Sequence, residues 1–135
     1  MAFAETRTAR VVEQGSCGVK ITLAGTVYAG DALGYSSGWK LSASATTIQP
    51  LLIAGQDGVS GDVITAYPVA VVKVITTVAN VATVGQKVAL SDAGAYQAAG
   101  SGLPDVGFVK SVGPDSLSAI LILQPSSPQL AVIRA

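Results

Sequence analysis

The chain has 135 residues, of which 50% are hydrophobic and 12% charged, and its formal net charge is zero. This length suits one domain, and so low a charge argues against an intrinsically disordered chain. The basic residues are scattered, so the cationic patch of a nucleic-acid-binding protein is absent. A surface this poor in charge indicates that much of it contacts other protein.

The first predicted element is a polar N-terminal arm over residues 1–16. Within it, Thr6-Arg7-Thr8-Ala9-Arg10-Val11-Val12 can extend as a strand, but no neighbouring segment offers a partner. The first residues lack a signal-peptide pattern, and no window approaches the roughly 18 apolar residues of a membrane helix. We therefore expect a protein made and kept in a cytosol, with no membrane partner.

Short β-strands are predicted through the middle of the chain. Residues 18–23 alternate apolar and polar side chains, which is typical of a half-buried strand. Further strands are expected at 62–67 and 69–75, on either side of Pro68, and at 116–123. Frequent Gly, Ser and Asp turns separate these runs. This pattern favours a small β-barrel or β-sandwich domain over residues 17–124.

An internal repeat joins two parts of this domain. Residues 27–41 and 82–96 share one order of features: a Gly-polar pair, a short strand, a Ser-containing turn that ends at Gly, and a strand with an aromatic residue. The offset is about 53–56 positions and continues downstream. The pattern indicates a duplicated, pseudo-symmetric domain, with chance likeness between glycine-rich hairpins as the alternative.

The C-terminal segment, 125–135, is predicted to be a short tail. Prolines at 125 and 128 break the chain after the last strand. The apolar residues Leu130, Val132 and Ile133 follow, and an apolar tail is costly to leave in water. We therefore expect these three side chains to contact another surface.

The sequence contains little catalytic chemistry. It has no histidine, so triads with a histidine base are excluded. Its one cysteine, Cys17, cannot form an internal disulfide or a thiolate cluster, and we interpret it as a small hydrophobic residue in a strand. The aspartates lie mostly in turn sequences and are predicted to stabilise turns: Asp57, Asp62, Asp92 and Asp115. We expect no enzymatic activity, no cofactor and no metal, and a hydrolase with paired carboxylates is the remaining enzymatic alternative.

Two aromatic residues leave a further alternative open. Tyr35 and Trp39 are close enough in sequence to form one exposed aromatic face, as a carbohydrate-binding module requires. Packing in the core or at a subunit interface is the competing interpretation, because Trp and Tyr are favoured there.

Several segments together resemble a known family. These are 84–94 (VGQKVALSDAG), 104–109 (PDVGFV) and 119–123 (AILIL), with 30–34 (GDALG) and 61–66 (GDVITA) before them. They resemble the capsid decoration proteins of tailed bacteriophages, also called cement or head-stabilising proteins. The resemblance covers roughly residues 25–123.

The resemblance implies a function. Such proteins bind the outside of an icosahedral head, commonly as trimers at three-fold positions, and stabilise it against the pressure of packaged DNA. Their N-terminal arms often add a strand to the capsid. It therefore implies a structural protein of the outer virion surface, made in the host cytoplasm, whose partners are the major capsid protein and further copies of itself.

Candidate capsid contacts lie at the two ends of the chain. The resemblance implies a binding arm, whereas the tail lies outside the resemblance and is a candidate because it is apolar. The arm residues are Thr6, Arg7, Thr8, Ala9, Arg10, Val11 and Val12, and the tail residues are Leu130, Val132 and Ile133. The alternative function is a carbohydrate- or receptor-binding β module such as a head fibre.

Overall fold

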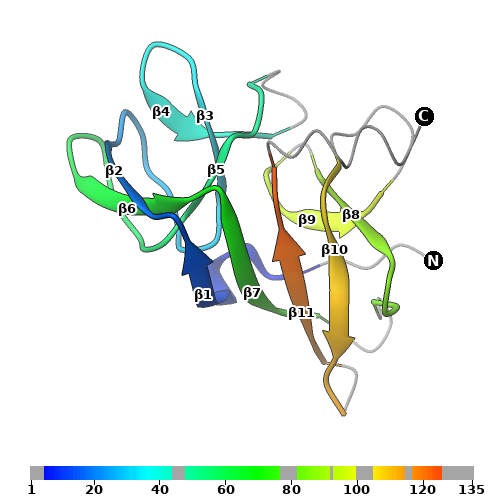
Figure 1. Ribbon diagram of the computed structural model, residues 1–135. Coiled ribbons are helices and arrows are strands. Elements are labelled where there is room, and N and C mark those ends of the chain that lie inside the picture. Colours follow the sequence, from blue (N-terminus) through cyan, green and yellow to red (C-terminus); the bar gives the residue numbers. More distant parts are fainter. Residues whose placement is uncertain are drawn as a thin grey trace.

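The computed structural model describes residues 5–43, 48–76, 82–91, 93–99, 105–114 and 117–125. They form two antiparallel sheets that pack together as a β-sandwich (Figure 1). The prediction of an all-β fold is confirmed. Of the two predicted architectures the sandwich is the one observed, since the described strands do not close into a barrel.

One sheet has six strands, in the order β1-β7-β11-β10-β8-β9, and the other has five, in the order β2-β6-β5-β3-β4. A short 3-10 turn, η1 (Arg7–Ala9), precedes the first strand. The strands in chain order are β1 (Val11–Ser16), β2 (Val19–Thr22), β3 (Ala32–Tyr35), β4 (Trp39–Leu41), β5 (Leu52–Ala54), β6 (Val63–Tyr67), β7 (Val69–Ile75), β8 (Lys87–Leu90), β9 (Tyr96–Ala98), β10 (Asp105–Val112) and β11 (Ser118–Leu123).

Alternating apolar side chains place the core between the sheets. In β7 every second residue is buried, as is the case in β11. Ala32 of β3 and Ile53 of β5 share one buried cluster with Val72 and Leu121 of the six-stranded sheet. Since burial of apolar area is the main favourable term in folding, this shared cluster holds the two sheets together.

The chain passes from one sheet to the other at two corners. Pro68 separates β6 from β7, and Cys17 separates β1 from β2 with a φ of 58°. The interpretation of Cys17 as a hydrophobic residue in a strand was wrong: it is exposed, in the left-handed conformation that this corner requires. The Tyr67 ring fills the corner so closely that a Cβ at Gly15 would lie 2.4 Å from it.

The predicted repeat is visible in the strand order. The sequence β2-β6-β5-β3-β4 in one sheet is matched by β7-β11-β10-β8-β9 in the other. Gly30 donates its N–H to the Ala54 carbonyl and Gly85 donates to the Val109 carbonyl, both at 2.8 Å, and the two bonds are offset by 55 positions at each end. The two glycines have φ of 86° and 85°. The two halves are therefore built on one plan.

The N-terminal segment is not an unpartnered arm. β1 pairs with β7 along its length, with Val12 opposite Val72, and the Thr6 N–H donates to the Ile75 carbonyl at 3.0 Å. The sequence predicted that no neighbouring segment pairs with it, and the strand with which it pairs is indeed distant in sequence. Its partner lies in the second half of the chain, where a local reading of the sequence does not find it. Residues 5–16 belong to the sandwich.

Candidate functional site

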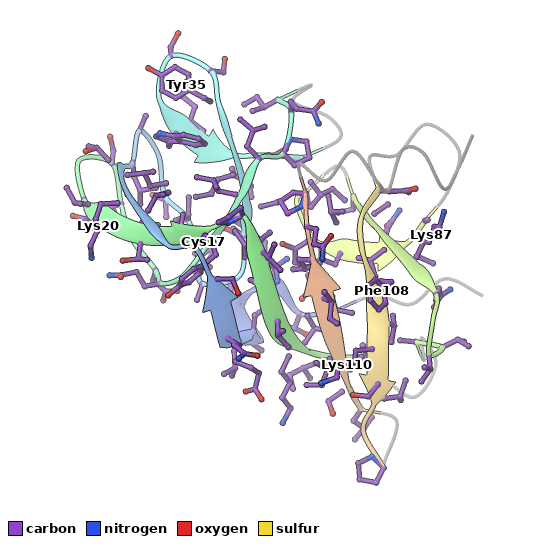
Figure 2. The ribbon with its side chains drawn as sticks, viewed as in Figure 1. Cys17, Lys20, Tyr35, Lys87, Phe108 and Lys110 are labelled. Atoms are coloured by element: carbon purple, nitrogen blue, oxygen red, sulfur yellow. The ribbon has the colours of Figure 1, made fainter. Side chains whose placement is uncertain are left out.

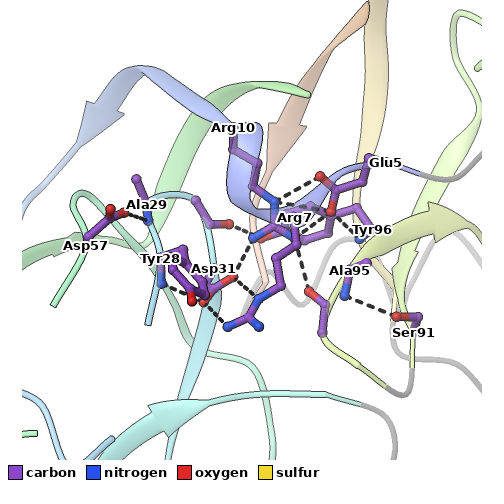
Figure 3. A network of polar contacts seen from close by, with 12 residues as sticks. Glu5, Arg7, Arg10, Tyr28, Ala29, Asp31, Asp57, Ser91, Ala95 and Tyr96 are labelled. Carbon is purple, nitrogen blue, oxygen red and sulfur yellow. Dashed lines mark hydrogen bonds and ion pairs between the residues drawn. The ribbon is translucent and has the colours of Figure 1, made fainter. Parts of the chain in front are cut away.

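A buried ionic cluster is the most concentrated chemistry of the described residues (Figure 3). Glu5, Arg7 and Arg10 come from the N-terminal segment, Asp31 directly precedes β3, and Tyr96 begins β9. The cluster therefore joins the N-terminal segment to both halves of the duplicated fold.

Arg10 is at the centre of this cluster. Its side chain is fully buried, and its Nη2 donates to Glu5 Oε2 and its Nη1 to Asp31 Oδ1, both at 2.5 Å. Nη2 also donates to the Gly94 carbonyl at 3.1 Å. A buried guanidinium is tolerated only when such partners replace its water.

Asp31 receives a second guanidinium from the solvent side. Arg7 donates from Nε to Asp31 Oδ1 at 2.8 Å and from Nη2 to Oδ2 at 2.6 Å, in the bidentate geometry that makes such pairs strong. The Tyr28 N–H also donates to Asp31 Oδ2, and the Arg7 guanidinium lies 4.9 Å from the Tyr28 ring centroid. Asp31 is thereby held without exposure to solvent.

Tyr96 closes the cluster from the second half of the fold. Its ring lies 4.4 Å from the Arg10 guanidinium carbon, a cation–π contact. Its hydroxyl donates to the Gly30 carbonyl at 2.5 Å and its N–H donates to Glu5 Oε2 at 2.9 Å. Burial raises the pKa of Tyr96 well above its ordinary value. The hydroxyl therefore remains a donor at any ordinary pH.

The charges within the cluster balance. Burial acts to lower the pKa of Arg10, but Tyr96, Glu5 and Asp31 together raise it above its ordinary value. The hydrogen bond to Asp31 is the main cause that raises the pKa of Arg7. Two guanidinium groups thus face two carboxylates, with each charge paired. This arrangement is suited to tying chain segments together rather than to moving a proton.

The pKa of Tyr96 predicts a loss of stability in alkali. Because its folded pKa is raised, its contribution is complete below the unfolded pKa of about 10 and is lost as the pH rises above that value. We expect this residue to lower the free energy of unfolding by about 1.4 kcal/mol per pH unit above pH 10. Denaturant unfolding of wild type and Tyr96→Phe from pH 8 to 12 isolates the effect, and parallel slopes for the two proteins would contradict it.

The structure divides the predicted arm residues into two groups. Arg7 and Arg10 face the ionic cluster, and Val12 packs against the core. The remaining arm residues are exposed: Thr6, Thr8, Ala9 and Val11. The predicted tail contacts, Leu130, Val132 and Ile133, lie outside the described residues.

Two aspartates have the turn role that the sequence predicted. Asp57 Oδ1 accepts the Ala29 N–H at 2.7 Å, and Asp62 Oδ2 accepts the Val59 N–H at 2.9 Å. Asp92 and Asp115 lie outside the described residues. Among the residues that the structure describes, no group of three or more acidic or Cys side chains is placed to hold a metal ion.

The aromatic pair does not form a flat platform. The Tyr35 and Trp39 rings lie 5.5 Å apart at 78°, an edge-to-face contact. Tyr35 is 64% exposed, whereas Trp39 packs against the buried cluster of the five-stranded sheet. Only the Tyr35 ring of this pair is exposed. Trp39 packs against apolar side chains, as the alternative to a carbohydrate-binding face predicted.

Comparison of this chain with protein-family models, with curated proteins and with solved structures found no match. No helix within the described part of the chain is long and apolar enough to cross a membrane. Fold, surface and the sequence resemblance are therefore the basis for a functional proposal.

Proposed function

We propose that the chain is a non-enzymatic capsid decoration protein that binds the outside of a tailed-phage head as a homotrimer and stabilises it. The proposal is supported by the sequence resemblance over roughly residues 25–123 and by the duplicated β-sandwich. Its binding requires no cofactor, nucleic acid or membrane. The partner is the major capsid protein of the head.

The observation that carries the proposal is the outer edge of β1. β1 is the terminal strand of the six-stranded sheet, and most of its residues are exposed, including Val11 at 51%. A terminal strand presents backbone donors and acceptors to which a strand of another protein can add. The N-terminal segment thus offers a fixed template for pairing with a capsid strand.

A fixed template has an energetic advantage over a loose arm. A loose arm loses conformational entropy when it orders on its partner, and this loss weakens binding. The ionic cluster and the pairing with β7 have already ordered residues 5–16 in the unbound protein. Three linked copies then increase the overall affinity through effective concentration, and each copy bridges neighbouring capsid subunits.

Co-sedimentation with undecorated heads of the phage that encodes this chain tests the proposal. We expect saturable binding and heads that withstand a higher temperature before they release DNA. A chain that stays in the supernatant at micromolar concentration would contradict the proposed function.

A point variant tests the contact at β1. Val11→Lys places a charge on the outer edge strand, where lysine discourages strand addition. We expect about tenfold weaker binding to heads. Val84→Lys, at a valine of 62% exposure in the turn before β8, is the matched control and should bind as wild type does. If Val11→Lys binds heads as tightly as Val84→Lys and wild type do, β1 does not form the contact. The proposal that the chain decorates heads would then remain, with another surface as the contact.

A further inference from the structure

The outer face of the six-stranded sheet carries an apolar row bordered by lysines. Phe108, 38% exposed, pairs with Ile122 on one side and with Lys87 on the other, and Ile122 pairs in turn with Val71. Lys110 is exposed two residues beyond Phe108 on β10 (Figure 2). Residues that pair directly across strands share a face of the sheet. Lys110 is exposed at the bulge between Val109 and Ser111, beside these side chains, and the surface they form with it is here called the basic face.

The charge around the apolar row of the basic face is positive. Lys73 of β7 also lies on it, opposite Ile120 of β11. Among the described strands of this sheet, the carboxylates are Glu13, on the edge strand β1, and Asp105, half-buried where β10 begins. A partner for this face should therefore combine carboxylates with exposed apolar side chains.

The same chain offers such a partner in residues 56–63, which are the loop before β6 and the first residue of that strand and are here called loop 56–63. Asp57 and Asp62 are exposed there, and between and beside them Val59 and Val63 are 54% and 60% exposed. Both carboxylates accept backbone N–H groups, which fixes the loop. Lys20, on the adjacent strand β2, donates to Thr65 Oγ1 at 2.8 Å.

The loop and the basic face cannot meet within one molecule. Figure 1 shows the loop before β6 at one end of the sandwich and β8 and β10 at the other. Any contact between them must therefore join two copies. Such a contact uses different surfaces on each copy, and head-to-tail contacts of this kind build a closed ring when the rotation between copies closes, and an open filament when it does not.

We propose that loop 56–63 of one copy binds the basic face of the next, and that three such contacts close the homotrimer. Val59 and Val63 pack near Phe108 and Ile122, while Asp57 and Asp62 face Lys87 and Lys110. This inference rests on the trimer of the proposed function and adds the interface that forms it.

Charge variants on the two surfaces test the interface. Lys87→Glu/Lys110→Glu reverses the basic face. Gln56→Lys/Ser60→Lys offsets the loop carboxylates at exposed positions and leaves their hydrogen bonds intact. We expect each pair to raise the concentration at which half of the chains are trimeric by about tenfold or more. Lys40→Glu, on β4 at the edge strand of the other sheet, is the matched control and should assemble as wild type does.

Light scattering after size-exclusion chromatography measures the molar mass of each variant in solution. Circular dichroism confirms that each variant is folded. Trimeric wild type with weakened double variants and an unchanged control supports the interface. Trimeric variants that match wild type would overturn the interface and leave the trimer intact. A wild type that is monomeric at high micromolar concentration would overturn both.

Discussion

Replacing Arg10 with methionine is expected to lower the free energy of unfolding by about 3–5 kcal/mol. The substitution removes the buried partner of both Glu5 and Asp31 and leaves their charges less well compensated inside the protein. Methionine fills a similar volume, so the loss reports on the ionic contacts more than on a cavity. Denaturant unfolding at neutral pH measures the difference.

Arg7→Met is the matched comparison for this prediction. The Arg7 side chain is 24% exposed against 0% for Arg10, and Asp31 keeps Arg10 when Arg7 is removed. We expect a loss of about 1.5–3 kcal/mol, the range of hydrogen bonds to charged groups. If the two variants lose similar free energies of unfolding, or if Arg10→Met loses less than about 1 kcal/mol, the ionic cluster does not stabilise the fold as described.

Deletion of residues 1–16 is expected to have a still larger effect and to abolish cooperative folding. It removes Glu5 and Arg10 from the cluster, and it removes β1 from the edge of β7. Asp31 then loses both of its guanidinium partners. The expected result is loss of near-ultraviolet circular dichroism and of a sharp thermal transition.

A shorter deletion provides the control for this experiment. Removal of residues 2–4 leaves the ionic cluster and β1 intact, and it should preserve the thermal transition. A truncated chain starting at Cys17 that folded as cooperatively as wild type would contradict the structural role of the segment. If the chain without residues 1–16 does not fold, its failure to bind heads is a consequence of unfolding. The role of β1 in capsid binding is then tested by Val11→Lys alone.

The period-two patterns account for the strands that were predicted. Residues 69–75 and 116–123 alternate or run apolar over strand length, and the strands β7 and β11 (Ser118–Leu123), which lie within them, are central in the six-stranded sheet. The repeat predicted that two halves would share one plan because Gly-polar pairs recur at equivalent turns. Neither pattern indicates which strand lies beside β1, since that pairing joins distant parts of the chain.

The ionic cluster was missed for a related reason. Arg7 and Arg10 lie in a polar segment, so the sequence predicted contact with another protein, whereas the structure places both against Asp31. Tyr96 and Glu5 are 91 positions apart and still share a hydrogen bond. The sequence does contain a pattern that could have predicted the cluster. Two arginines lie close together in a chain with only 12% charged residues, which indicates that they pair with carboxylates.

We propose above all that this chain decorates the outside of a phage head. Cryo-electron microscopy of heads incubated with the purified chain, compared with untreated heads, tests it most directly. We predict added density on the outer surface at three-fold positions, three copies to each, with β1 against the capsid. Heads without added outer density, or density confined to the tail, would contradict the claim.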